Sequence, residues 1–441
     1  MDKNYDVIVV GGGLAGLTAT YKLTKDNKRV LLLEKDSILG GRTSSFIDKG
    51  IEIESGFHRQ IGFYKDFPKL LKEIGIKLDD IIMWEDEAEI KISKDKSLVL
   101  GIAPFYAPFT FIKDILGNKE ILSVKDKFSL IKLFLIGMKD YTMRPKSLDK
   151  YSVLSYAKKH NIEENVIKYI ATSLSTGIFF LPIDKYSAKL FFGLFYPSIF
   201  RFPKMTIGAY KMGMSDAFIK PLALEIEKQG GVIKTLSSVQ NLIIEDNRVI
   251  GVVVNNQKIF SKSVILATDI NNFKIICKNT NHNNLEEFQK IPTISEITVQ
   301  IELSEALMPK DRTTFTPTTM IASFTEESRS TFKESKGRVS VILVSCEKFK
   351  KLSDEELLNL VKEEFLKIGL SIEKKILDYR VVRHIDKFYD FSFNNDHFRP
   401  EAKTSIKGLY LAGDYTRQKW YSTMEGAVVS GIEAANIILD N

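Results

Sequence analysis

Three glycines near the start of the chain have the spacing of a phosphate-binding turn: Gly11, Gly13 and Gly16. They follow a continuous apolar run at residues 7–10. In such a turn the first glycine permits a tight bend, the second lets the backbone approach a pyrophosphate, and the third brings helix and strand close together. Leu14 and Ala15 would open the helix whose free N–H groups attract phosphate. The spacing therefore predicts a dinucleotide site.

An acidic residue ends the next apolar run along the chain. Glu34 lies 18 residues after Gly16, and Lys35 follows it directly. A carboxylate at this place accepts hydrogen bonds from the adenosine ribose, and its charge repels a 2′-phosphate. We therefore expect Glu34 and Lys35 at the adenosine end of the site, and we expect NADP to be disfavoured.

A glycine pair followed by an arginine favours FAD over a nicotinamide. The sequence Gly40-Gly41-Arg42 stands close behind the first motif. Its arginine can neutralise the pyrophosphate of FAD, while the backbone of Gly41 admits the ribityl chain. An ordinary surface turn would have no need for that arginine. Gly41 and Arg42 are therefore predicted FAD contacts.

A second group of motifs, near the end of the chain, has the composition expected around a flavin ring. Gly413 and Asp414 follow the apolar run at residues 409–412, so the carboxylate can accept hydrogen bonds from ribityl hydroxyls. Thr423 and Met424 stand at the start of a helix predicted over residues 424–436. The dipole of that helix would stabilise negative charge on the reduced ring.

The elements that position these motifs are strands and helices in alternation. Residues 5–34 predict a strand, a helix and a second strand, because a continuous apolar run is typical of a strand buried on both faces. Residues 221–228 predict a helix, and strands are expected over 232–235, 239–245, 249–254 and 263–268. Val239, at the start of one of them, is expected on the adenine side.

The remaining segments have a different character. Residues 104–205 mix aromatic, apolar and basic side chains, which favours helices. Strands are predicted over 294–303 and 339–345, and a charged helix over 354–368. We therefore predict an α/β protein with a discontinuous, Rossmann-type FAD-binding domain of the glutathione-reductase-like kind.

The predicted domain boundaries follow from these shifts in composition. The FAD-binding domain comprises residues 1–65, 215–275 and 390–441, and an inserted α+β substrate-binding domain comprises 66–100 and 276–389. A helical, membrane-facing region comprises 101–214. Within it, aromatic residues beside lysine and arginine at 179–204 suit a membrane interface, although such stripes are also common in ordinary cores.

Composition excludes several classes of protein. The 441 residues carry a net charge of +7 without a long Lys/Arg block, so no nucleic-acid partner is expected, whereas an anionic membrane surface is compatible. Cys277 and Cys346 stand far apart, which predicts no disulfide scaffold and no metal site, and favours a reducing cytoplasm. A strand that starts at Tyr5 leaves no room for a leader peptide. No apolar run reaches the roughly 18 residues of a membrane-spanning helix.

These motifs together resemble a known family. Residues 9–42 are similar to the flavin-containing amine oxidase and carotenoid desaturase superfamily. Residues 412–431 are most similar to plant- and cyanobacterial-type phytoene and ζ-carotene desaturases, which share Ala-Gly-Asp-Tyr-Thr-Lys-Gln before Met-Glu-Gly-Ala. Residues 55–58, followed by 62–64, also resemble the Gly-Leu-His and Gly-Ala-Tyr stretch of those enzymes.

The resemblance implies an enzyme with noncovalent FAD that desaturates a long polyisoprenoid, peripheral to the cytoplasmic membrane. A hydride would pass from an allylic carbon to flavin N5, a proton would pass to a weak base, and a quinone-type acceptor would take the electrons. Gly56 and Phe57 are then predicted flavin contacts. His58 and Arg59 beside them are candidate catalytic residues. A packed histidine is the simpler alternative for His58, and Arg59 stands where those desaturases have an apolar residue.

Three alternatives remain open at this point. An amine oxidase would place an aromatic residue just before Met-Glu-Gly, where this chain has Thr423, although Trp420 fits the amine oxidase pattern. Another isoprenoid enzyme, such as a hydroxysqualene dehydroxylase-like or carotenoid isomerase-like protein, is hard to separate by sequence. A flavin-holding scaffold without catalytic activity is the third.

Overall fold

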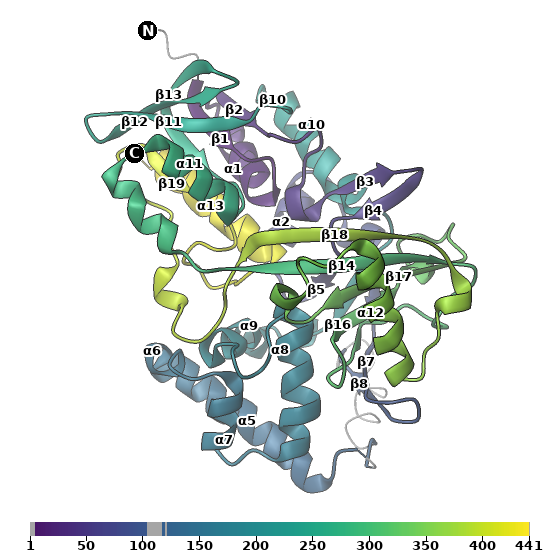
Figure 1. Ribbon diagram of the computed structural model, residues 1–441. Helices are drawn as coiled ribbons and strands as arrows, with labels where there is room; N and C mark the ends of the chain where they lie inside the picture. The colour runs from purple at the N-terminus through teal and green to yellow at the C-terminus, as the bar shows by residue number, and fades with distance from the viewer. Residues whose placement is uncertain (1–4, 104–116, 120, 441) are drawn as a thin grey trace.

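A parallel sheet joins the two ends of the chain. The computed structural model describes residues 5–103, 117–119 and 121–440. In spatial order the parallel strands are β10 (Val232–Lys234), β2 (Val30–Leu33), β1 (Tyr5–Val10), β13 (Gln257–Leu266) and β19 (Leu409–Leu411). Three distant stretches of sequence thus build one sheet, with both termini on its side of the molecule (Figure 1). The strands predicted over 5–34, 232–235 and 409–412 are confirmed.

One strand of this sheet starts earlier than its sequence suggests. The strand expected over 263–268 is the second half of β13, whose first half pairs in antiparallel fashion with β12 (Arg248–Val254). The strand β12 in turn pairs with β11 (Val239–Glu245), as the predicted ribbon requires. The first half of β13 was not predicted because residues 257–262 include two lysines and form no continuous apolar run. The ribbon is partly exposed there, so a strand does not need such a run.

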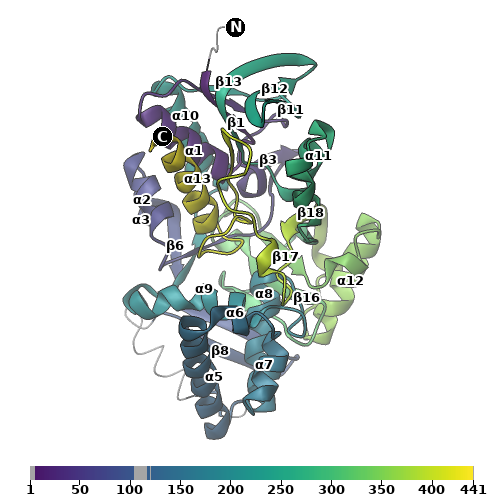
Figure 2. The same cartoon turned by 90° about the vertical axis from the view of Figure 1, so that its left-hand side faces the viewer.

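Helices cover the parallel sheet. They are α1 (Leu14–Lys25), α10 (Lys220–Lys228), α11 (Ile270–Thr280) and α13 (Met424–Leu439). Figure 2 shows α13 lying along α1, so the first and last helices are neighbours. A Cβ on Gly431 would lie 2.4 Å from the carbonyl oxygen of Ala15, which explains the small-residue face of α13. A further helix, α2 (Asp66–Glu73), packs on α13, and the short α3 (Leu78–Ile81) follows it.

A second sheet, also of seven strands, crosses the middle of the molecule. Its strands in spatial order are β18 (Ile376–Tyr389), β14 (Thr293–Leu303), β17 (Gly337–Leu343), β16 (Ile321–Glu326), β15 (Thr314–Phe315), β7 (Glu87–Lys91) and β8 (Ser97–Gly101). The helix α12 (Asp354–Lys367) packs its apolar side against β14, β16 and β17. Strands near 294–303 and 339–345 and the helix at 354–368 were expected and are present. The long β18 was not predicted individually.

Two small sheets link the larger ones. One pairs β3 (Ser45–Asp48) with β4 (Ile51–Glu54), and the other comprises β5 (Arg59–Ile61), β9 (Ile207–Tyr210) and β6 (Ile82–Glu85). A 3-10 turn at Gly41–Thr43 precedes β3. The segment that carries Gly41 to Arg59 therefore runs from the parallel sheet to the second sheet.

The far end of the molecule is helical. Its helices are α5 (Val124–Met143), α6 (Pro145–Leu148), α7 (Val153–Lys159), α8 (Thr172–Phe179) and α9 (Ala188–Phe200). The helices expected over 104–205 are confirmed from residue 124 onward, while 104–116 and 120 lie outside the described residues. Among the described helices, none combines the length and apolar character that crossing a membrane requires.

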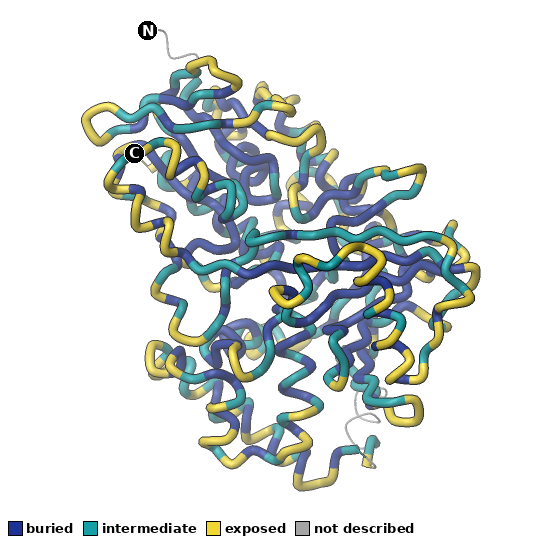
Figure 3. Tube along the Cα trace, viewed as in Figure 1, coloured by how far each residue is buried: buried dark blue, intermediate teal, exposed yellow. Residues whose placement is uncertain are grey.

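Buried residues follow these layers. Figure 3 shows the central strands of both seven-stranded sheets mostly buried and the edge strand β18 mostly intermediate, while exposed residues gather at loops and on outer helix faces. The fold is therefore a mixed α/β architecture, as predicted. The division into three domains at the predicted boundaries stays a prediction.

Candidate functional site

One cavity of about 990 Å³ collects the motifs from both ends of the chain. All but one of the predicted cofactor residues line it, namely Gly11, Gly13, Leu14, Ala15, Glu34, Lys35, Gly41, Arg42, Gly56, Phe57, Val239, Gly413, Asp414, Thr423 and Met424. The exception is Gly16, which lies behind the turn, where a Cβ would come 2.0 Å from the carbonyl oxygen of Gly11. Gly16 therefore acts through helix packing rather than through contact with a ligand.

The glycine turn leaves room where a dinucleotide would need it. Gly11 has φ of +108°, and its Cβ would meet the carbonyl oxygen of Ala267 at 2.7 Å, so the bend requires glycine. Gly13 differs, because its Cβ would have only the Gly40 carbonyl oxygen nearby, at 3.9 Å. Helix α1 begins at Leu14 with no side chain capping it, so its first N–H groups stay available. The open cradle fits a pyrophosphate.

Glu34 is fixed in place by the backbone. Its Oε2 accepts a hydrogen bond from the Gly12 N–H at 2.6 Å, and its Oε1 accepts one from the Asp36 N–H at 2.9 Å. The side chain is buried and still lines the cavity. Each carboxylate oxygen can accept more than one hydrogen bond, so both can also receive ribose hydroxyls.

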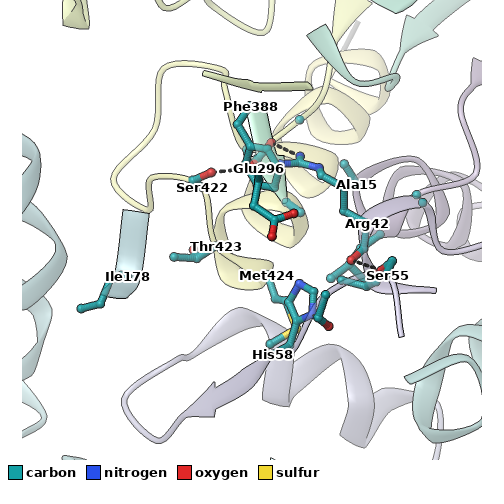
Figure 4. A pocket seen from close by; sticks show the side chains of 18 of the residues that line it. Ala15, Arg42, Ser55, His58, Ile178, Glu296, Phe388, Ser422, Thr423 and Met424 are labelled. Carbon is teal, nitrogen blue, oxygen red and sulfur yellow. Dashed lines mark hydrogen bonds and ion pairs between the residues drawn. The ribbon is translucent and has the colours of Figure 1, made fainter. Parts of the chain in front are cut away.

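Arg42 and Asp414 meet across the cavity from opposite ends of the sequence. Arg42 Nη2 lies 2.5 Å from Asp414 Oδ1, and the guanidinium sits 4.6 Å from the ring centroid of Phe388 on β18 (Figure 4). The Ser422 hydroxyl donates to the other oxygen of Asp414, at 3.2 Å. The two residues predicted to contact FAD therefore hold each other in position.

The start of α13 is built by two side chains with different tasks. Thr423 caps the helix, since its hydroxyl accepts a hydrogen bond from the Gly426 N–H at 3.0 Å. Glu425 accepts three backbone hydrogen bonds of 2.7–2.8 Å from residues 65–67, at the start of α2. Thr423 and Met424 line the cavity, whereas Glu425 fixes α2 to α13.

His58 and a second histidine, His384, flank the flavin-side motifs. His58 Nδ1 lies 2.9 Å from the Gly56 carbonyl oxygen, and His384 Nε2 lies 2.6 Å from the Ser55 carbonyl oxygen. Burial lowers the pKa of each imidazole to about 4, so both are neutral at physiological pH. Both line the cavity. A neutral imidazole that donates to a carbonyl keeps its other nitrogen as an acceptor.

Arg59 lies at the same cavity, but its charge is balanced. Its guanidinium pairs with Glu85 Oε1 at 2.6 Å and with Asp311 Oδ1 at 2.7 Å, and it donates to Thr325. All of these groups are buried. Two carboxylates neutralise the cation that otherwise suits an apolar cavity poorly. A catalytic role for Arg59 stays a prediction, and the structure assigns it this ion-pair network.

The second sheet supplies cavity residues that were not predicted from the sequence. Glu296 and Thr298 on β14 and His384 and Phe388 on β18 all line the cavity. Burial raises the pKa of Glu296 to about 8. The sequence does hold one indication of these residues. Glu296, Thr298 and Gln300 place a polar side chain at every second position of the buried strand β14, so these side chains share one face.

The cavity becomes apolar where it reaches the helices. Its lining there is supplied by α5, α8, α9 and the segment after α9, through Phe134, Leu135, Met138, Leu174, Ile178, Leu194, Phe195, Ile199 and Phe202. The rings of Phe134 and Phe195 pack edge to face, with centroids 5.5 Å apart. One continuous space therefore has a polar nucleotide end and an apolar end. Among the described residues, no group of His, Cys, Asp and Glu side chains could hold a metal ion.

The fold and the site define a dinucleotide-binding oxidoreductase of the flavin type, because two walls far apart in sequence face one cavity. The family model for flavin containing amine oxidoreductases matches residues 14–439, and the chain belongs to that family. A flavin cofactor follows from this membership, and the residues present fit it.

Known proteins resemble this chain over its whole length. A 15-cis-phytoene desaturase of Glycine max is 25% identical over 464 residues, which cover 100% of this chain and 80% of that protein. A ζ-carotene desaturase of Synechocystis is 22% identical and covers 99% of this chain and 97% of that protein. The solved structure of an oxidoreductase from Methanosarcina mazei has a TM-score of 0.78 at 19% identity, covering 98% and 99% of the two chains. The expected similarity to carotenoid desaturases is confirmed.

Proposed function

We propose that this protein is an FAD-dependent desaturase of a long polyisoprenoid, of the phytoene or ζ-carotene type. The observation that carries the proposal is the single cavity in which the flavin motifs continue into an apolar space between α5, α8 and α9. An extended hydrocarbon needs such a space, whereas a small polar substrate does not. The whole-length similarity to phytoene and ζ-carotene desaturases supports the same substrate class.

The chemistry needs positioning more than strong acids. When bound, oxidised FAD supplies a hydride acceptor at N5. Glu34 would hold the adenosine ribose, the start of α1 the pyrophosphate, and Arg42 with Asp414 the pyrophosphate and ribityl chain. Thr423 and Met424 would lie along the ring at the start of α13. The apolar walls keep water away from the reacting carbons and hold the chain in line.

FAD is proposed to bind without a covalent link. Both cysteines, Cys277 and Cys346, are buried, and neither lines the cavity. Release of the flavin on acid denaturation would support this point. A flavin that stayed with the precipitated protein would contradict it.

We also propose that the protein sits on the surface of the cytoplasmic membrane. Four apolar residues form an exposed stripe on α5, spaced three and four positions apart: Val124, Phe128, Ile131 and Leu135. Ile199 and Phe200 at the end of α9 are exposed as well, at 50% and 72%. Leu135 and Ile199 also line the cavity, so the apolar surface reaches its mouth. A hydrophobic substrate and a quinone-type electron acceptor could both enter there from the lipid.

Lysines on the same helix suit an anionic membrane. Lys125, Lys132 and Lys139 are exposed on α5. Vesicles with anionic lipid should therefore retain the protein better than neutral vesicles, and added salt should weaken the difference. A double variant with serine in place of Phe128 and Phe200 should bind the vesicles at least severalfold more weakly than wild type. The control variant has serine in place of Leu224, an exposed residue of α10 outside this stripe, and should bind like wild type. Equal binding by all three proteins would contradict the proposed surface.

Expression in a bacterial host that accumulates phytoene tests the substrate. The expected result is a coloured, more conjugated product that depends on Glu34, identified by its absorbance and mass. Colourless cells that contain the flavin-loaded protein would count against a carotenoid substrate. Bleaching of the flavin by mono- or polyamines without oxygen would favour an amine oxidase instead. Thr423 at the place of an aromatic wall argues against that outcome.

A further inference from the structure

A glutamate enters the cavity from the second sheet. Glu296 lies on β14, where its side chain is 3% exposed and lines the cavity. Figure 4 shows its carboxyl group pointing into the space bordered by Thr423, Met424 and His58. The Thr298 hydroxyl, two residues along the same strand, donates to Oε1. This side chain belongs to none of the cofactor motifs at the ends of the chain.

Its cross-strand neighbour is a histidine. In the antiparallel register of β14 and β18, Glu296 pairs with His384, so both side chains stand on the same face of the sheet. The Nε2 of His384 faces the Ser55 carbonyl oxygen, while its buried Nδ1 has no hydrogen-bond partner within the described part of the chain. A buried nitrogen without a partner is costly to keep unless it is used, and this one belongs to a residue that lines the cavity beside Glu296.

The charges around Glu296 come from several elements. Arg42, within the 3-10 turn Gly41–Thr43, is the cation whose charge lowers the pKa of Glu296, but burial has the larger effect and raises that pKa to about 8. His58 and His384 stay neutral, and the pKa of the Cys346 thiol is raised by burial and, to a smaller extent, by the charge of Glu296. Asp414 is paired with Arg42. Among the described residues, Arg42 is the cation whose charge lowers the pKa of Glu296, and Arg42 shares that charge with Asp414.

We propose that Glu296 is the base that takes the proton from the substrate, held by Thr298 and backed by His384. The inference rests on the proposed function, because it names the proton acceptor of that reaction. Loss of a hydride from one carbon leaves a cation that must lose a proton from the next carbon. The C–H electron pair then becomes the second bond of the new alkene, and the proton bonds to a carboxylate oxygen of Glu296. The two electrons of the oxidation leave with the hydride, and oxidised FAD would accept them.

The environment suits that task. A carboxyl that ionises near neutral pH is a stronger base than an ordinary glutamate, and a matching pKa favours general base catalysis. The ionised form accepts the proton, and its fraction grows as pH rises toward 8. The protonated form predominates at pH 7 and spares the apolar cavity a fixed charge. Water is scarce in an apolar cavity, so a protein group has to accept the proton.

The test compares wild type with Glu296→Gln and Glu296→Asp, using phytoene in liposomes and a quinone. Glu296→Gln should lower kcat at least a hundredfold with little change in KM, and Glu296→Asp should restore part of the activity. The rise of kcat with pH, centred near 8 in the wild type, should be missing in the Gln variant. Flavin content and anaerobic photoreduction should be unchanged, which a merely structural role would not predict.

An infrared titration of the flavin-free protein gives a readout without turnover. A protonated-carboxyl C=O band should disappear as pH passes about 8, and Glu296→Gln should lack it. Glu433→Gln is the matched control, since Glu433 on α13 is half-buried, has a raised pKa and does not line the cavity. A Gln variant with wild-type turnover and pH profile, or with an unchanged infrared band, overturns the inference. Wild-type protein that desaturates no polyene overturns the proposed function instead, and the infrared result still decides on the carboxyl group.

Discussion

Arg42 and Asp414 form an ion pair 2.5 Å long between residues that are 372 positions apart in the chain. The pair closes the cavity between the N-terminal and C-terminal flavin motifs. Its two members are 25% and 8% exposed, so solvent screens it only in part. The cofactor site therefore depends on a contact that exists only after the parallel sheet has brought both ends together.

The first prediction concerns this pair. Asp414→Asn keeps the shape of the side chain but removes its charge, so we expect FAD to bind at least tenfold more weakly. Arg42→Gln should have a similar effect. The double variant should lose less FAD-binding free energy than the two single variants lose together, and the difference should be about 1–3 kcal/mol. Titration of the apoprotein with FAD, followed by quenching of flavin fluorescence, measures the affinities. Strictly additive losses would mean that the two residues act on FAD separately.

The second prediction separates binding from folding at the glycine turn. Gly13→Ala should leave the stability of the apoprotein nearly unchanged, because the new methyl group meets only one atom, at 3.9 Å, yet it should weaken FAD binding at least tenfold. Gly16→Ala should instead lower the free energy of unfolding by about 1–3 kcal/mol, since its Cβ would clash with the Gly11 carbonyl oxygen. Thermal unfolding of both apoproteins checks this. Equal destabilisation by the two substitutions would contradict the assignment of Gly13 to the ligand.

The third prediction concerns the glutamate of the Met-Glu-Gly motif. Glu425 satisfies three backbone N–H groups at the start of α2, so Glu425→Ala should lower the free energy of unfolding by about 2 kcal/mol or more. FAD affinity should fall less than in Asp414→Asn, because Glu425 does not line the cavity. Denaturant unfolding of the apoprotein gives the first number. Unchanged stability with lost flavin would show that Glu425 serves the cofactor directly.

The fourth prediction is the pH dependence of stability caused by Glu296. Burial raises the pKa of Glu296 from 4.5 to about 8, so between these values the folded protein holds a proton that the unfolded chain releases. The contribution of Glu296 to stability is present at low pH and is lost as pH rises toward 8. Relative to wild type, Glu296→Gln should therefore become more stable by a few kcal/mol between about pH 5 and 9. Unfolding free energies of the two apoproteins with the same slope against pH would contradict the shift.

Much of the cofactor site could be predicted because its signals are local. The turn at Gly11, the acid at Glu34 and the helix start at Met424 each need only a few neighbouring residues and a strand before them. A short apolar run, a glycine and a cap fix these conformations almost independently of the rest of the chain. For the same reason β1, α1 and α13 were expected close to their observed bounds.

The residues contributed by the second sheet could not be found in this way. The strand β18 alternates irregularly and is only half-buried, so no clear period marks it. Its register against β14 places His384 beside Glu296, and a slip of β18 by one residue would have turned His384 away from the cavity. The pairing of Arg59 with Glu85 and Asp311 is equally invisible in sequence, since the partners are 26 and 252 positions away.

The amino-acid sequence by itself determined the flavin motifs, the parallel strands and the family. Tertiary structure alone decided which charges neutralise each other, where Glu425 is anchored and which acid faces the cavity. The physical reason is that hydrogen-bonded turns and helix starts are set by a few successive residues. Ion pairs and strand register depend instead on long-range packing. The local sequence around one partner gives no information about which distant residue it will contact.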